Sequence, residues 1–137
     1  LVGTNDRIEK QLPANIISIH RTANQTELAE IYTAADLFVN PTREENFPTV
    51  NIESLACGTP VLTYRTGGSP EMLDETCGYV VGKDDLEALL QQINNAYENR
   101  PFSVQNCIKK ASNYVAMNKY QEYFHLYHCG NRARGEL

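Results

Sequence analysis

The 137-residue sequence contains no tryptophan, and none of its apolar runs approaches the roughly 20 residues needed to cross a membrane. Its first residues, Leu1-Val2-Gly3-Thr4, lack the charged and apolar regions of a secretory signal peptide. The 12 basic residues are outnumbered by 17 acidic residues, which gives a net charge of −5. A nucleic-acid-binding surface is therefore not expected, because such a surface requires a basic face.

The sequence also lacks the short motifs of several protein classes. Its four cysteines form no C-x-x-C pair and have no histidine at a zinc-ligand spacing, so we expect free thiols and no metal site. The patterns G-x-G-x-x-G, G-x-x-x-x-G-K-S/T and G-x-S-x-G are absent. These absences argue against a dinucleotide-binding dehydrogenase, a P-loop nucleotide hydrolase and the usual serine-hydrolase elbow.

What the chain does contain is a regular alternation of short apolar runs and amphipathic stretches. The predicted buried strands are 16–19, 36–40, 59–64 and 78–81. The predicted helices are 24–35, 48–57, 69–71 and 84–97, with helical sequence again from residue 104. Strand–helix units of this length are typical of an α/β fold, with a Rossmann-like parallel sheet and helices on both faces.

The last third of the chain is predicted to be helical. The expected apolar faces are Leu86, Leu89, Leu90, Ile93 and Tyr97, then Val104, Ile108, Ala111 and Val115, then Met117, Tyr120, Phe124 and Tyr127. We expect one domain over residues 1–128, followed by a polar, disordered tail over 129–137. Because the chain begins without methionine and inside an expected strand, we expect it to be a fragment.

Candidate ligand-binding residues follow the strands, because parallel sheets bind ligands at the carboxyl ends of their strands. The loop 41–48 carries Glu45, and the helix behind it carries Glu53. A helix N-terminus suits a phosphate, and a carboxylate beside it can meet hydroxyls or a developing positive charge. The alternative is that Glu44 and Glu45 only complement the helix dipole on a solvated loop.

Two other features could contribute to the same edge of the sheet. Gly67-Gly68 follows a predicted strand and allows close backbone approach to a ligand, although a glycine pair is more often only a turn. His20 and Arg21 follow strand 16–19 and are candidates for lining the cleft. His125 and His128 are expected to be surface or packing residues.

The order of these motifs resembles one known enzyme family. The stretch 45–61 reads ENFPTVNIESLACGTPV, and the stretch 67–71 reads GGSPE. LAEIY precedes them at 28–32, and CGYVV follows at 77–81. Together these segments resemble the C-terminal domain of retaining glycosyltransferases of family 4 (glycosyl transferases group 1), over about residues 1–127.

The resemblance implies a GT-B architecture, in which two Rossmann-like domains face each other and the C-terminal one binds a nucleotide-sugar donor. It implies that Glu45 is the catalytic residue against the donor sugar and that Glu53 binds the ribose hydroxyls. Arg21, after strand 16–19, is expected to meet the base. The other expected donor-binding residues are Asn46, Phe47, Pro48, Thr49 and Val50.

For the whole protein, the resemblance implies transfer of a hexose with retention from a nucleoside-diphosphate sugar, with UDP favoured over GDP, to a glycan or lipid-linked acceptor. No metal or other cofactor is expected, since no D-x-D motif follows a strand. The family's first βα unit, with an Arg and a Lys for the diphosphate, and its acceptor domain would precede this stretch. We therefore expect a truncated domain that binds donor weakly, transfers nothing alone and leaves a sheet position unpaired.

We expect a cytoplasmic location, and any attachment to the inner face of the membrane would come from the N-terminal domain. Two other interpretations stay open. The first is a non-catalytic nucleotide-sugar binding or regulatory domain, against which the intact Glu45 and Glu53 pair argues. The second is a flavodoxin-like receiver module, which would need an acidic cluster after the first strand and a lysine after a late strand, and neither is present.

Overall fold

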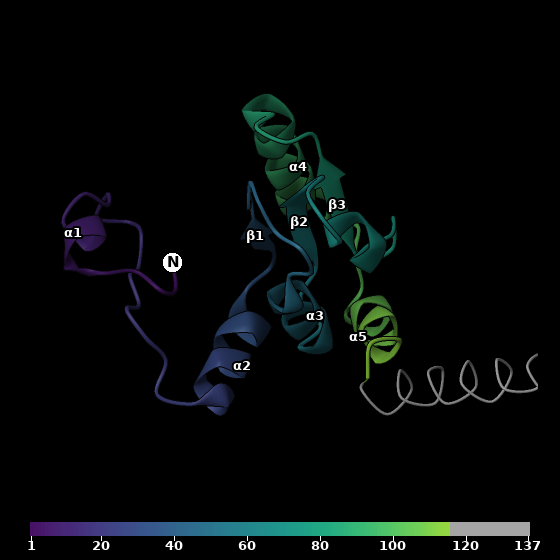
Figure 1. Ribbon diagram of the computed structural model, residues 1–137, viewed down its shortest axis with the longest axis horizontal. Helices are drawn as coiled ribbons and strands as arrows, with labels where there is room; N and C mark the ends of the chain where they lie inside the picture. Colours follow the sequence, from purple (N-terminus) through teal and green to yellow (C-terminus); the bar gives the residue numbers. More distant parts are fainter. Residues whose placement is uncertain (116–137) are drawn as a thin grey trace, which may run out of the picture.

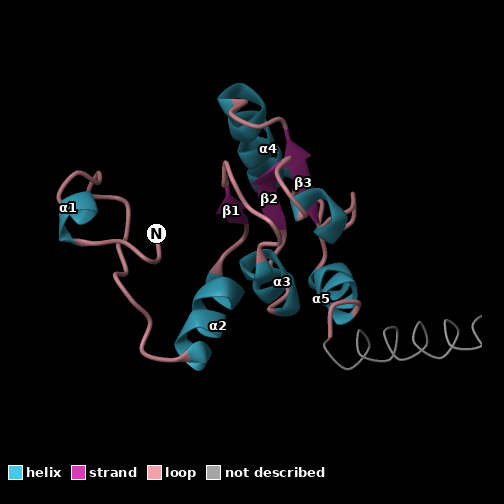
Figure 2. Cartoon of the chain, viewed as in Figure 1, coloured by secondary structure: helices cyan, strands magenta, loops and turns pink. Residues whose placement is uncertain are grey.

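The computed structural model of the chain describes residues 1–115. Several predictions fall outside the described residues: the tail 129–137, the domain end at residue 128, the surface or packing role of His125 and His128, and the apolar face of Met117, Tyr120, Phe124 and Tyr127. The elements, in chain order, are α1 (Asp6–Glu9), α2 (Gln25–Ala34), β1 (Phe38–Asn40), α3 (Thr49–Ala56), β2 (Val61–Tyr64), the 3-10 helix η1 (Ser69–Met72), β3 (Gly78–Val81), α4 (Leu86–Asn99) and α5 (Val104–Ser112) (Figures 1 and 2).

The three strands form one parallel sheet in the order β1-β2-β3. Val39 pairs with Leu62, and Leu62 pairs with Tyr79, so the strands run in register and their carboxyl ends meet at one edge. Each crossover between neighbouring strands carries a helix, as parallel pairing requires. The predicted Rossmann-like α/β class is therefore confirmed.

Alternate residues of the strands build two separate cores, one on each face of the sheet. On one face, Val61 packs with Leu55 of α3 and Cys107 of α5. On the other face, Leu62 packs with Leu89 of α4. Because successive side chains of a strand point to opposite faces and both faces are covered, β2 is buried along its whole length. Helices cover both faces, as the sequence predicts.

The helices begin where the sequence places capping side chains. Asn24, Asp85 and Ser103 each accept a hydrogen bond from a backbone N–H in the first turn of α2, α4 and α5. The predicted apolar faces are only partly buried, however. Leu86, Leu90, Tyr97, Val104, Ile108 and Val115 are exposed. A sheet of three strands is narrow, so only the central residues of each apolar face, such as Leu89 on α4, reach it.

The prediction of a buried strand at 16–19 is wrong. Ile17 is 77% exposed, and the segment forms a single parallel bridge, between Val2 and Ile19. Residues 1–20, with the unpredicted helix α1, lie beside the sheet and do not join it (Figure 1). Within residues 1–115, no third strand pairs with these two short segments, so they bury little apolar surface. Within the described residues, β1 is consequently an edge strand of the sheet.

The loop before β3 is tied to α5 by an ion pair. Lys110 Nζ lies 3.0 Å from Asp74 Oδ2, and Thr76 donates to Asp74 Oδ1 from its hydroxyl at 2.6 Å and its N–H at 3.0 Å. The hydrogen bonds from Thr76, followed by the one from Lys110, hold the pKa of Asp74 well below its ordinary value. The same pairing raises the pKa of Lys110, against the opposing effect of burial.

Because the folded state favours the Asp74 carboxylate, this contact stabilises the fold above the ordinary aspartate pKa of about 4 and is lost as pH falls below it. In Asp74→Asn, the free energy of unfolding is expected to decrease less steeply as the pH falls below about 4. The expected effect is less than about 1 kcal/mol, because the Asp74 side chain is 43% exposed. Urea unfolding at several pH values would measure it, with Asp36→Asn as the control on a looser ion pair. Equal acid sensitivity of Asp74→Asn and the unchanged protein would contradict this assignment.

Among residues 1–115, no helix has both the length and the apolar character required to span a membrane.

Candidate functional site

Two loops meet at the edge of the sheet where β1 and β2 end. The loop 41–48 follows β1 and the loop 65–68 follows β2. The Gly68 N–H donates to the Asn46 carbonyl at 2.7 Å. Gly67 has a φ of +48°, and a Cβ built on it would lie 1.7 Å from the carbonyl oxygen of Glu45. Only glycine fits there, so the predicted glycine pair acts as more than a turn.

Buried polar side chains connect these loops to the strands. Asn40, at the end of β1, donates from Nδ2 to Oδ1 of Asn51 at 2.9 Å, and the Thr63 hydroxyl donates to the Asn40 carbonyl at 2.8 Å. The Thr66 hydroxyl donates to the Thr42 carbonyl at 3.0 Å. Asn51, Thr63 and Thr66 are all buried. They were missed as site residues; in the sequence, the asparagine within an otherwise apolar helix face and the threonine before the glycine pair were the available signals.

Glu45, the predicted catalytic residue, lies on the loop 41–48 with its side chain exposed. Its Oε1 accepts a hydrogen bond from the Asn46 N–H at 2.9 Å, so the carboxylate is oriented while remaining open to a ligand. Phe47 is 44% exposed, and its ring lies 6.0 Å from that of Tyr114 in a tilted arrangement. On the same loop, Arg43 Nε lies 2.6 Å from Asp84 Oδ1, which ties it to the loop after β3.

The N-terminus of α3 directly follows this loop and has no side-chain cap. Pro48, the buried N-cap residue, offers no hydrogen-bonding side chain. Thr49 and Val50, the first two helical residues, are exposed. The other α-helices within residues 1–115 are all capped, by Asn5, Asn24, Asp85 and Ser103. An uncapped N-terminus beside an open loop carries the positive end of the helix dipole and suits an anionic ligand.

Glu53 lies one turn further along α3 and lines a cavity of about 320 Å³ between α2 and α3. Tyr32 of α2, buried against Phe38 with ring centroids 5.2 Å apart, lines the same cavity. Burial, followed by the negative charge of Glu53 and a hydrogen bond to it, raises the pKa of Tyr32 to about 12. Burial also raises the pKa of Cys57, another lining residue, so this thiol stays protonated near neutral pH.

Two buried polar atoms at this edge of the sheet have no hydrogen-bond partner among the described residues. They are Nδ2 of Asn51, in the first turn of α3, and Oγ of Ser69, at the start of η1. Buried donors in native proteins are nearly always paired with protein, water or ligand. Both atoms therefore have hydrogen-bonding capacity available for water or a bound ligand.

The structure does not bring Arg21 into this site. Arg21 is exposed, and no hydrogen bond or ion pair within residues 1–115 joins it to α3 or to the loop 41–48. The reason is the displacement of residues 1–20 from the sheet, which also removes the strand end from which Arg21 was expected to reach the cleft (Figure 1).

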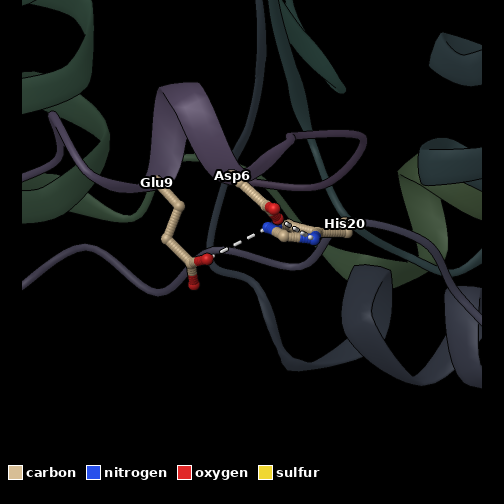
Figure 3. Close-up of side chains that lie close together, drawn as sticks. All are labelled: Asp6, Glu9 and His20. Carbon is tan, nitrogen blue, oxygen red and sulfur yellow. Dashed lines mark hydrogen bonds and ion pairs between the residues drawn. The ribbon is translucent and has the colours of Figure 1, made fainter.

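His20 lies between two carboxylates of the unpredicted helix α1 (Figure 3). Its Nε2 lies 3.1 Å from Glu9 Oε2, and its Nδ1 lies 3.5 Å from Asp6 Oδ1. This is the group of residues within 1–115 whose ligand atoms could surround a metal ion, and all three are exposed. However, opposite ring nitrogens face the two carboxylates, so one ion could not use both nitrogens. The arrangement fits an imidazole held between two carboxylates better than a metal centre.

Residues 4–114 match the family described as Glycosyl transferases group 1. The chain belongs to this family. Its fold is similar to that of sucrose-phosphate synthase from Thermosynechococcus elongatus, with a TM-score of 0.71 and 26% identity over 89% of this chain and 33% of that one. This similarity supports the predicted GT-B type of the fold.

The chain is also similar to enzymes whose names state different activities. The chain is 40% identical over 73 residues to D-inositol 3-phosphate glycosyltransferase 2 of Catenulispora acidiphila, covering 53% of this chain and 17% of that protein. It is 33% identical over 79 residues to the lipopolysaccharide core biosynthesis mannosyltransferase LpsB of Rhizobium meliloti, covering 56% of this chain and 22% of that protein. The chain thus spans about a fifth of the length of these relatives.

Proposed function

We propose that this chain is the donor-binding part of a retaining hexosyltransferase. The donor is a nucleoside-diphosphate sugar, with UDP favoured over GDP, and the acceptor is a glycan or a lipid-linked glycan. The observation that carries the proposal is the juxtaposition of an oriented, exposed Glu45 carboxylate with the uncapped N-terminus of α3. A carboxylate beside an anion-binding helix end matches a sugar joined to a diphosphate.

In the proposed mechanism, each group stabilises a different charge. Departure of the nucleoside diphosphate builds negative charge, which the N–H groups of Thr49 and Val50 at the positive end of α3 stabilise. Positive charge builds on the sugar ring, next to Glu45. Pro48 contributes shape and no hydrogen bond, because it has no N–H. With the phosphates held by backbone N–H groups, we expect binding to persist in the presence of a metal chelator.

The α2–α3 cavity supports a place for the nucleoside. Glu53 lies on the same helix whose N-terminus would hold the diphosphate, and its carboxylate lines a cavity of about 320 Å³. Carboxylate oxygens accept hydrogen bonds from the two ribose hydroxyls. The largely apolar remainder of the lining, including Leu28 and Ala29, suits the ring of a base.

Titration of the complete gene product with UDP and with GDP tests this assignment. Glu53→Ala is expected to weaken binding of the preferred nucleotide by about 10- to 100-fold, because it removes hydrogen bonds to a charged group worth about 1.5–3 kcal/mol. Glu30→Ala, on α2, is the matched control and should leave the affinity unchanged. Equal affinities for both variants would show that the nucleoside binds elsewhere. The isolated residues 1–137 are expected to bind more weakly and to transfer nothing.

A further inference from the structure

The loop after β2 holds the loop of Glu45 at several points. The Thr66 hydroxyl donates to the Thr42 carbonyl at 3.0 Å, and the Thr42 hydroxyl in turn donates to the Glu44 carbonyl at 3.2 Å. The Gly68 N–H donates to the Asn46 carbonyl at 2.7 Å. Glu45 lies between these two anchors, with its carbonyl packed directly over Gly67. The position of the Glu45 backbone is thus defined by the loop after β2.

Among these anchors, Thr66 is the one whose side chain makes the contact. Its side chain is 8% exposed, so water competes poorly for the hydroxyl. Its backbone is fixed as well, since its N–H donates to the Tyr64 carbonyl at 2.9 Å and its carbonyl accepts from the Ser69 N–H at 3.1 Å. Because the Thr66 backbone is held by both of these hydrogen bonds, its hydroxyl can fix the position of the loop 41–48.

We propose that Thr66 is a positioning residue for Glu45. Its hydroxyl sets the start of the loop 41–48 and, through Thr42, the peptide of Glu44, so that the Glu45 carboxylate projects toward the sugar. This inference rests on the proposed function of Glu45. Thr66 itself touches neither the nucleotide nor the sugar. Its loss should therefore reduce the rate of the chemical step and leave donor binding nearly unchanged, because a small misplacement of a reacting group costs rate.

A second buried threonine near β2 offers a matched control. Thr59, before the other end of β2, is 2% exposed, and its hydroxyl donates to the Tyr32 carbonyl at 2.6 Å. Thr59→Val and Thr66→Val remove the same kind of buried hydroxyl-to-carbonyl bond and keep the shape of the side chain. Both should lower the melting temperature by a similar amount. Only Thr66→Val should change the position of the Glu45 carboxylate.

The experiment measures nucleoside diphosphate release by the complete gene product, with UDP-glucose, UDP-N-acetylglucosamine and GDP-mannose as donor probes. For the donor that is used, Thr66→Val is expected to lower kcat about tenfold or more with KM changed less than about twofold. Thr59→Val should retain kcat, and Thr66→Ser, which keeps the hydroxyl, should restore it. Equal kcat values for the two valine variants, or no recovery in the serine variant, would overturn the proposal.

Including Glu45→Gln separates this inference from the proposed function on which it rests. A strong loss of kcat in Glu45→Gln together with equal valine variants would reject Thr66 as a positioning residue while keeping the role of Glu45. Unchanged kcat in Glu45→Gln would reject the role of Glu45 itself, and with it the need to position that residue.

Discussion

Replacing Gly67 with alanine is expected both to destabilise the protein and to weaken donor binding strongly. The φ of +48° costs an alanine about 1–2 kcal/mol, and the new Cβ would lie 1.7 Å from the carbonyl oxygen of Glu45. Since that neighbour is backbone, the loop 41–48 must move by more than 1 Å to make room. We expect the free energy of unfolding to fall by more than about 2 kcal/mol and nucleotide-sugar affinity to fall about 100-fold.

Gly3→Ala is the control for the Gly67 substitution. Gly3 also has a positive φ, +80°, but a Cβ there would have nothing within 4 Å. The difference between the two variants, measured by urea unfolding and by donor titration, isolates the effect of the contact with Glu45. If Gly67→Ala cost no more stability than Gly3→Ala and kept its affinity, the two loops would not be packed as described.

The parallel sheet and its helices could be predicted because the sequence patterns that indicate them are local and match the burial seen in the structure. The strands β1, β2 and β3 lie in short apolar runs bounded by Pro41, by the glycine pair and by Gly82. Their crossover helices, α3 and η1, begin within one or two positions of the predicted starts. The central strand β2 is buried along its whole length, so an apolar run without alternation was the correct signal there.

The structure of residues 1–20 could not be predicted in the same way, because the burial of a strand depends on whether other strands pair with it. Ile16, Ile17 and Ile19 form an apolar run like those of the true strands, yet this segment meets only a single bridging partner, Val2. Composition identifies a segment able to enter a sheet, but the presence of a neighbouring strand decides whether it does. The position of Arg21 away from the loop 41–48 follows directly from this.

The sequence indicates those parts of the candidate site whose chemistry depends on residue type. It does not indicate the parts that depend on how two distant loops pack together. Glu45, Glu53 and the start of α3 are recognisable from a carboxylate pair around a helix start. The packing of Gly67 on Glu45 depends on two loops separated by about 20 residues in sequence, and nothing local reports their distance. The same holds for the hydrogen bond from Thr66 to Thr42.

Glu45→Gln is expected to lower the rate of sugar transfer by the complete gene product by about 100- to 1,000-fold, because it removes the negative charge next to the developing positive charge. Glutamine has the same shape, and its Oε1 can still accept the hydrogen bond from the Asn46 N–H. The loop should therefore keep its structure, and the melting temperature and the affinity for free UDP or GDP should stay unchanged. The measurements are kcat for nucleotide-sugar turnover and nucleotide affinity by titration.

The neighbouring residue supplies the control for this substitution. Glu44→Gln removes the same charge one position earlier, on an equally exposed side chain. If the effect came only from the charge of the loop acting on the dipole of α3, the two variants would behave alike. If the effect comes from contact with the sugar, only Glu45→Gln loses turnover. Full activity in both variants, with nucleotide binding intact, would favour a domain that binds nucleotide sugars without taking part in catalysis.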